Sequence, residues 1–259
     1  MIRKATVKYQ IIDMEKPVLI FYFVLLCILV FGFVASGAKF AVPDNMVTFT
    51  SGSGVSGMEL ATVIFLFVSG LNSFKEFFRF FMQNSISRKT IFVSRLITIL
   101  AVCTGMALID KGILLLGKLI ASHSTGIFYT GLFDMIYAAR AERISTVQMH
   151  IDGFFFNLCM YIAAMTIGYF ITIAFYRMNK IAKITVAIGV PMLLLNGLPL
   201  LDAALLHGAI FKALMNAVSF VFGFQNGGNP YFGMVFLVLI TAAFLSLSWL
   251  MMRRAVVKD

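Results

Sequence analysis

The chain has 259 residues, of which 61% are hydrophobic and only 12% are charged, and its mean hydropathy is +0.96. A water-soluble domain carries about 25% charged residues, so this composition excludes a soluble globular protein and makes lipid the solvent for much of the surface. A net charge of +10 would suggest nucleic acid in a soluble protein. Here the position of the charge matters more than its sum, and we expect no nucleic-acid partner.

Six apolar runs are each long enough, or nearly so, to cross the hydrocarbon of a bilayer, which takes about 20 residues. The first run exceeds the core of a signal peptide, about 7–15 residues, so we expect it to be a retained span. The sequence therefore predicts an all-α polytopic membrane protein, with residues 1–259 forming a single membrane domain of six transmembrane helices. The predicted spans are residues 18–36, 59–74, 91–116, 153–176, 184–201 and 231–252.

Basic residues alternate between successive polar pieces of the chain. Fifteen of the 21 lysines and arginines fall in or next to the N-terminus, the second and fourth connections and the C-terminus, while seven of the 11 acidic residues fall on the other side of the membrane in this layout. Basic segments stay in the cytoplasm. The pattern predicts that both termini are cytoplasmic.

The three outer connections differ in character. Residues 37–58 are rich in Gly and Ser and are expected to be flexible. Residues 121–152 form a long loop, in which apolar residues at helical spacing over 132–147 predict a short external helix. Residues 202–230 contain an apolar segment at 209–224 that is too short for a comfortable span, which favours a re-entrant or interfacial helix.

The fifth span contains Pro191 and Pro199. Proline removes a helical hydrogen bond and frees backbone carbonyl groups. We therefore expect this span to be kinked or broken near residues 196–197.

The connection between the second and third spans carries the most informative local pattern. Phe74, Phe77, Phe78 and Phe81 lie at i, i+3, i+4 and i+7 and form one apolar stripe, while the charged residues between them fall on other faces. This pattern predicts an amphipathic helix at the membrane interface. Asn84 and Ser85 then end it, and Ser87 can cap the helix of the third span. A positively charged loop with phenylalanine anchors and no partner would show the same pattern.

Residues 83–92, which read Gln-Asn-Ser-Ile-Ser-Arg-Lys-Thr-Ile-Phe, resemble the cytoplasmic segment after the second span in permease subunits of type-2 ATP-binding-cassette exporters. That segment often reads Asn-Gly-Ile/Val-Ser-Arg-Lys/Arg-Thr, so this chain has Ser85 where glycine is usual. The resemblance extends to the layout: the length, six spans, both ends inside, and a basic amphipathic cytoplasmic helix within residues 1–17.

The resemblance implies a bacterial permease without ATPase activity of its own. Two cytoplasmic ATPase subunits, which bind ATP and Mg, would dock on a coupling helix at residues 75–90, and a second identical or related permease subunit would complete the transporter in the lipid bilayer. The residues expected to contact the ATPase are Lys75, Glu76, Arg79, Asn84, Ser85, Ser87, Arg88, Lys89 and Thr90. Arg88 and Lys89 could equally bind lipid phosphate.

Residues 112–119, Gly-Ile-Leu-Leu-Leu-Gly-Lys-Leu, match the first seven positions of a phosphate-binding loop. The eighth position should be Ser or Thr to hold magnesium, and no strand precedes the segment. We expect no ATP site there and no cofactor bound by this chain. The three cysteines lie in separate apolar runs and the three histidines are scattered, so neither a disulfide framework nor a catalytic or metal site is predicted.

Few ionisable residues fall inside the predicted spans. Arg95 lies near the cytoplasmic end of the third span and can snorkel to the interface, while Asp110 and Lys111 lie near its outer end, where they could pair with loops. This scarcity argues against a transporter driven by protons. Asn72, Asn157 and Asn196 are candidates for interhelical hydrogen bonds or for the lining of a pathway.

The sequence thus predicts an exporter permease of the cytoplasmic membrane that moves a hydrophobic or amphipathic substrate, such as a peptide, lipid or drug. Two alternatives remain open. One is a membrane-embedded enzyme with its site in the outer loops, although no catalytic motif is recognised. The other is a non-transporting scaffold or the transmembrane component of an energy-coupling-factor system, although the only near match to its Ala-Arg-Gly motif, residues 139–141, lies in an outer loop.

Overall fold

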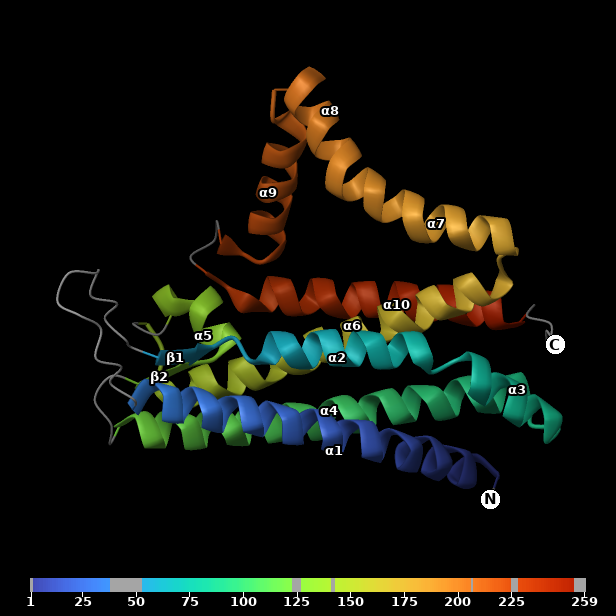
Figure 1. The fold of residues 1–259 in the computed structure, drawn as a ribbon, viewed down its shortest axis with the longest axis horizontal. Coiled ribbons are helices and arrows are strands. Elements are labelled where there is room, and N and C mark those ends of the chain that lie inside the picture. Colours follow the sequence, from blue (N-terminus) through green and yellow to red (C-terminus); the bar gives the residue numbers. More distant parts are fainter. Residues whose placement is uncertain are drawn as a thin grey trace. The chain divides into compact units, whose positions relative to one another are not determined.

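The computed structural model describes residues 2–37, 53–122, 127–140, 143–205, 207–224 and 228–253, and most of them are helical (Figure 1). Within these residues, six helical stretches are long and apolar enough to cross a membrane. The prediction of an all-α polytopic membrane protein is confirmed. The six stretches are Lys4–Phe31, Glu59–Gln83, Arg88–Ile120, Thr146–Arg177, Lys180–Asp202 and Pro230–Arg253.

Several helices extend beyond the apolar runs, because backbone hydrogen bonding continues into the polar flanks. The N-terminal helix and the first span are one continuous helix that passes through Pro17 without a break. The helices are α1 (Ile2–Gly37), α2 (Glu59–Asn72), α3 (Lys75–Gln83), α4 (Arg88–Ser122), α5 (Leu132–Ile136), the 3-10 turn η1 (Ala138–Arg140), α6 (Thr146–Arg177), α7 (Lys180–Met192), the π-helical turn η2 (Leu193–Gly197), α8 (Leu198–Leu205), α9 (Ala209–Val221) and α10 (Pro230–Arg253).

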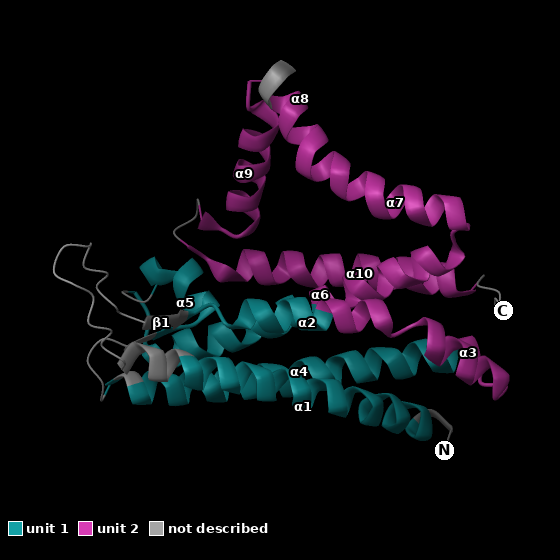
Figure 2. Cartoon of the chain, in the orientation of Figure 1, with its two compact units in different colours: residues 1–66, 89–162 teal, residues 67–88, 163–259 magenta. Residues whose placement is uncertain are grey.

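The described residues form two compact units (Figure 2). Unit 1 comprises residues 1–66 and 89–162, and unit 2 comprises residues 67–88 and 163–259. Helices α2 and α6 each contribute their first part to unit 1 and their last part to unit 2.

In unit 1, α1 and α4 run parallel and in register. Gln10 donates a hydrogen bond to Ser94, and Tyr22 donates one to the carbonyl of Met106. Both pairs are separated by 84 residues in sequence, and the two contacts lie twelve residues apart, about 18 Å along a helix. The start of α1 therefore lies beside the start of α4. Arg95 is buried here, with only 2% of its surface exposed, so the expectation that it snorkels to the interface is wrong.

Unit 1 also contains a short parallel strand pair that the sequence did not predict. Strand β1 (Ser53–Ser56) pairs with β2 (Ile127–Thr130), in the register Ser53 to Ile127, and the amide of Gly57 donates to the carbonyl of Thr130 over 3.1 Å. The expectation that residues 37–58 are flexible is thus wrong for 53–56, because their backbone groups pair with a distant segment. Residues 38–52 lie outside the described part.

The predicted external helix over 132–147 is also wrong in extent. Helix α5 ends at Ile136, the turn η1 ends at Arg140, and α6 begins at Thr146. The apolar spacing continues across the point where α6 begins, so it did not indicate a new helix there. The Ser145 hydroxyl accepts a hydrogen bond from the amide of Gln148 over 3.3 Å, as an N-cap does.

In unit 2, α2 and α6 run parallel at very close range. The hydroxyl of Thr172 donates to the carbonyl of Leu71, and Gly70 lies against Gly168 with no room for a side chain on either. Glycines allow such backbone contact between membrane helices.

The fifth span has the interruption that its prolines predicted. Its backbone changes from α to π geometry at Leu193–Gly197 and returns to α at Leu198. Beyond it, the predicted apolar helix of the last outer connection is present as α9. Asp202 joins the two, because its carboxylate accepts hydrogen bonds from the amides of Ile210 and Phe211, over 2.8 and 2.9 Å.

Candidate functional site

Residues 75–90, the predicted coupling element, comprise α3, a turn and the first residues of α4. Phe74, Phe78 and Phe81 are buried, with 2% or less of each exposed. Their neighbours Lys75, Glu76 and Arg79 are exposed. The two-faced helix predicted from the phenylalanine spacing is thus present, and its charged face is open.

The buried face of α3 is fixed to the last turns of α6. The ring of Phe74 stacks on that of Phe78, with 4.9 Å between centroids. The same ring meets the edges of Tyr169 and Tyr176 at 5.9 and 5.4 Å, and Phe78 meets Tyr176 at 5.9 Å. Aromatic pairs at these distances add to the stabilisation from burial. Helix α3 and the end of α6 therefore form one packed aromatic cluster.

A tight turn follows α3. Asn84 donates a side-chain hydrogen bond to the carbonyl of Phe80 over 2.8 Å, and Ser85 adopts φ = 55°. This left-handed conformation strains residues that have a Cβ and favours glycine. The family that this segment resembles usually has glycine at this position, and the left-handed backbone of residue 85 also favours glycine. Ser87 precedes α4 directly, in the position of an N-cap.

Arg88 connects this element to the other end of the chain. Its guanidinium donates a hydrogen bond of 2.6 Å to the carbonyl of Arg253, the last residue of α10. Cationic groups at a helix C-terminus satisfy its free carbonyls and oppose its dipole. Arg88 is half-buried, as is Thr90, whereas Lys89 is exposed. Lys89 is therefore better placed than Arg88 to meet another chain.

The three asparagines have different surroundings. Asn72, at the end of α2, and Asn196, within η2, are exposed. Asn157 on α6 is 6% exposed, and its Oδ1 has no hydrogen-bond partner among the described residues. Of the three, only Asn157 thus lies inside the helix packing.

Sequence reasoning missed a buried polar cluster around Asp110 in unit 1. Asp110 is 1% exposed. The expectation that it pairs with loops is wrong, because its hydrogen bonds come from two other spans. Tyr22 of α1 donates to Oδ1 over 2.8 Å, and Tyr161 of α6 donates to Oδ2 over 2.5 Å. The hint was available, because an acidic residue within an apolar run usually has a partner in another helix.

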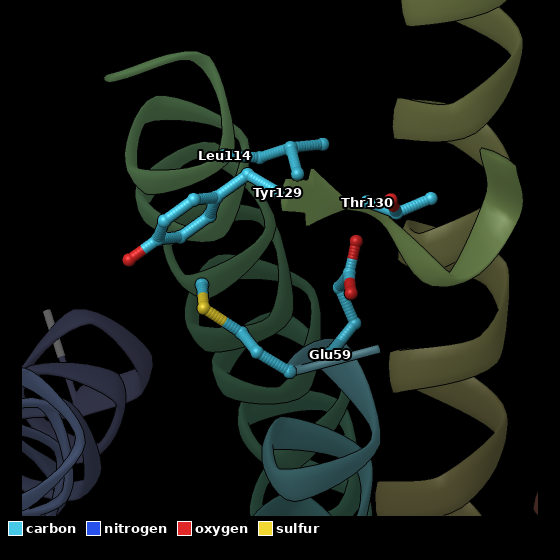
Figure 3. A pocket seen from close by; sticks show the side chains of 5 residues that line it. Glu59, Leu114, Tyr129 and Thr130 are labelled. Carbon is cyan, nitrogen blue, oxygen red and sulfur yellow. The ribbon is translucent and has the colours of Figure 1, made fainter. Parts of the chain in front are cut away.

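Glu59, at the first residue of α2, is a second buried carboxylate, 3% exposed. It accepts a hydrogen bond of 3.0 Å from the amide of Leu132, at the start of α5. Figure 3 shows its side chain beside a small cavity that Leu114, Tyr129 and Thr130 also line. The cavity measures about 10 Å³, which is room for about one water molecule.

Two ion pairs fasten the segment between β2 and α6 to its surroundings. Lys118 contacts Asp134 over 2.5 Å, and Arg140 contacts Asp152 over 2.8 Å. Between them Tyr137 packs against Phe133 and Phe156. Burial raises the pKa of Tyr137 to about 12, although the charge of Arg140 opposes this shift.

Two further features bear on chemistry. The segment that partly matches a phosphate-binding loop, residues 112–119, lies within α4, so its amides are engaged in helical hydrogen bonds. Among the described residues, no group of three His, Cys, Asp or Glu side chains is arranged to hold a metal ion.

Comparison with known proteins gives no relative. No family model matches the chain, and neither a curated protein nor a solved structure matches it.

Proposed function

We propose that this multi-pass membrane protein is the permease subunit of an ATP-binding-cassette exporter in the cytoplasmic membrane of a bacterium. It would move a hydrophobic or amphipathic substrate, such as a peptide, lipid or drug, and two separate ATPase subunits would supply the energy. The observation that carries the proposal is the two-faced construction of α3. Its charged face is open, while its apolar face is packed into the aromatic cluster with α6.

This construction suits the transmission of force. A partner that pushes on Lys75 and Arg79 would move the buried phenylalanines, and with them the last turns of α6, because close-packed side chains transmit displacement. The hydrogen bond from Arg88 to Arg253 extends the connection to α10. Residues 75–90 would thus couple a cytoplasmic docking event to two membrane-spanning helices.

The sidedness of the proposal follows from charge. Within unit 2, the ends of α6 and α10 lie beside α3 and Arg88, and within unit 1 the start of α1 lies beside the start of α4. All of these segments are basic. By the positive-inside rule we assign them to the cytoplasm, where an ATPase could reach α3.

The fifth span offers a face for the second permease subunit. Among the described residues, the 23-residue stretch Lys180–Asp202 buries none of its apolar window, and it exposes the polar side chain of Asn196. A polar amide in hydrocarbon gains from a hydrogen bond to another helix, by about 0.6 kcal/mol on average. Contact with a second subunit would provide one.

Purification of the tagged chain from its own membranes in mild detergent tests the proposal. We expect an ATPase subunit to co-purify, and we expect the variants Lys75→Glu and Arg79→Glu to reduce its recovery and its ATP hydrolysis. Lys212→Glu is the matched control, because Lys212 is an exposed lysine on α9, far along the chain from α3. It should leave recovery unchanged.

Full recovery of the ATPase with both α3 variants would remove α3 as the contact. Purification of an active chain without any ATPase would reject the exporter assignment altogether. Arg88 should not be used as the probe for docking, because its substitution also breaks the hydrogen bond to Arg253.

A further inference from the structure

The Asp110 cluster lies among packed helices of unit 1, where a charge is costly. Asp110 is six residues from the midpoint of the span Arg88–Ile120, which is about 9 Å along a helix. The carboxyl group is almost fully buried there by four helices, since it contacts residues of α1 and α6 and faces α2.

Among the described residues, no cation is paired with Asp110. Neither of the ion pairs Lys118–Asp134 and Arg140–Asp152 includes Asp110, and the adjacent Lys111 is not among the groups that act on it. The titratable groups that face it are the phenols of Tyr22 and Tyr161 and the carboxylate of Glu59. Glu59 adds like charge. A buried carboxyl group without a counter-ion usually takes up a proton instead of remaining charged.

The hydrogen bonds around Asp110 can rearrange to accommodate that proton. The single hydroxyl hydrogen of Tyr22 faces two acceptors, Oδ1 of Asp110 at 2.8 Å and the carbonyl of Met106 at 3.1 Å. With a proton on Oδ1, Asp110 donates to Tyr22 and Tyr22 donates to Met106. Tyr161 still donates to Oδ2. The protonated carboxyl group is thus satisfied on both oxygens.

The cluster also contains a donor for the ionised form. The hydroxyl of Thr62 on α2 is fully buried and faces Asp110 and Tyr161, and it has no aligned hydrogen-bond partner in the part of the chain that the structure describes. After the proton leaves, Thr62 can rotate to donate to the carboxylate. One set of side chains can therefore serve both protonation states.

We infer that Asp110, with Tyr22, Thr62 and Tyr161, forms a proton-binding site inside the membrane-spanning bundle. Asp110 holds a proton at neutral pH while the bundle is packed, and it releases the proton when α1 or α6 moves far enough to admit water. The sequence analysis took the scarcity of ionisable residues to argue against a transporter driven by protons, and a proton site at Asp110 weakens that reasoning. The inference is independent of the proposed ATPase partner and concerns the isolated full-length chain.

Infrared difference spectroscopy of the whole protein in lipid nanodiscs, titrated with alkali, tests the inference. We expect the carbonyl stretch of a protonated carboxylic acid to be present at neutral pH, to disappear at alkaline pH, and to be absent from Asp110→Asn. The Asn variant should keep the stability of the parent, because it mimics the neutral acid, whereas Asp110→Ala should not.

Two conservative variants keep the test decisive if Asp110 variants fail to fold. Thr62→Val removes the donor for the ionised form and should move the disappearance of the band to higher pH. Glu59→Gln removes the like charge and should move it to lower pH. Thr166→Val, at a buried threonine of α6 whose hydroxyl likewise has no hydrogen-bond partner among the described residues, should cause no shift. The inference would be overturned by a spectrum at neutral pH without an Asp110 band. It would also be overturned if the band disappeared at the same pH in Thr62→Val and Glu59→Gln as in the parent protein.

Discussion

Gly70 on α2 and Gly168 on α6 bring two helix backbones of unit 2 into direct contact. A Cβ on Gly70 would lie 3.1 Å from the Cα of Gly168 and still closer to the carbonyl oxygen of Met165. A Cβ on Gly168 would collide with the carbonyl oxygen of Phe67. Neither obstacle is a side chain that could rotate away.

Alanine at either glycine should therefore force α2 and α6 apart. We expect Gly70→Ala and Gly168→Ala each to lower stability by about 1–3 kcal/mol, as overpacking does, seen as a lower unfolding midpoint in detergent. Gly112→Ala is the control, because nothing lies within 4 Å of a Cβ there, and a helical alanine is favoured over glycine by about 1 kcal/mol. Equal midpoints for all three variants would contradict the close contact.

Ser85→Gly should stabilise the turn after α3. The left-handed φ of 55° costs a residue with a Cβ about 1–2 kcal/mol, which glycine avoids. Part of this gain is lost to the larger entropy of glycine in the unfolded chain. We expect a net rise in the unfolding midpoint, and Ser87→Gly, at the start of α4, should instead lower it or leave it unchanged. A decrease for Ser85→Gly would mean that residue 85 does not adopt this conformation.

Asp202 should control the order of α9. Its carboxylate accepts hydrogen bonds from the amides of Ile210 and Phe211, and loss of such a cap costs about 0.5–2 kcal/mol. In Asp202→Ala we expect faster hydrogen exchange across residues 209–221, and in Asp202→Asn, which keeps one acceptor, a smaller effect. Unchanged exchange in both variants would show that α9 does not depend on this cap.

Tyr137 should make the protein sensitive to alkali. Its pKa is raised to about 12 in the folded protein, against about 10 in an unfolded chain. The contribution of the neutral Tyr137 phenol to the free energy of unfolding is present in full below about pH 10. It is lost as the pH rises from about 10 to 12, because the phenol releases its proton at a lower pH in the unfolded chain than in the folded protein.

The corresponding comparison is between the parent protein and Tyr137→Phe. The difference in their unfolding midpoints should shrink or change sign in favour of the variant between pH 10 and pH 12, since phenylalanine has no proton to lose. A difference that stays constant over this interval would show that Tyr137 titrates normally.

Hydropathy and proline positions were sufficient to predict the six spans, the helix at 209–221 and the interruption near Asn196. These features depend on local composition. The phenylalanine spacing likewise predicted both faces of α3, because the periodicity of a single helix determines which residues it buries.

The features that the sequence did not predict depend on contacts between distant segments. Strand β1 pairs with residues more than 70 positions away in the sequence, and Tyr22 donates a hydrogen bond to Asp110, 88 residues later in the sequence. Nothing in the local sequence determines which helices meet. Arg95 and Asp110 were expected at the lipid or loop surface. Both are buried, because of helix packing that the local sequence does not determine.

The π turn at Leu193–Gly197 has a consequence for how the chain tolerates a change of length. Each residue of an α-helix advances the side-chain direction by about 100°. Removing one residue from α7 would therefore rotate all later residues of the span by about 100° about the helix axis. Because a π turn already contains one residue more than an α turn, removal of Leu194 would convert it to ordinary helix and leave the phase of α8 and α9 almost unaltered.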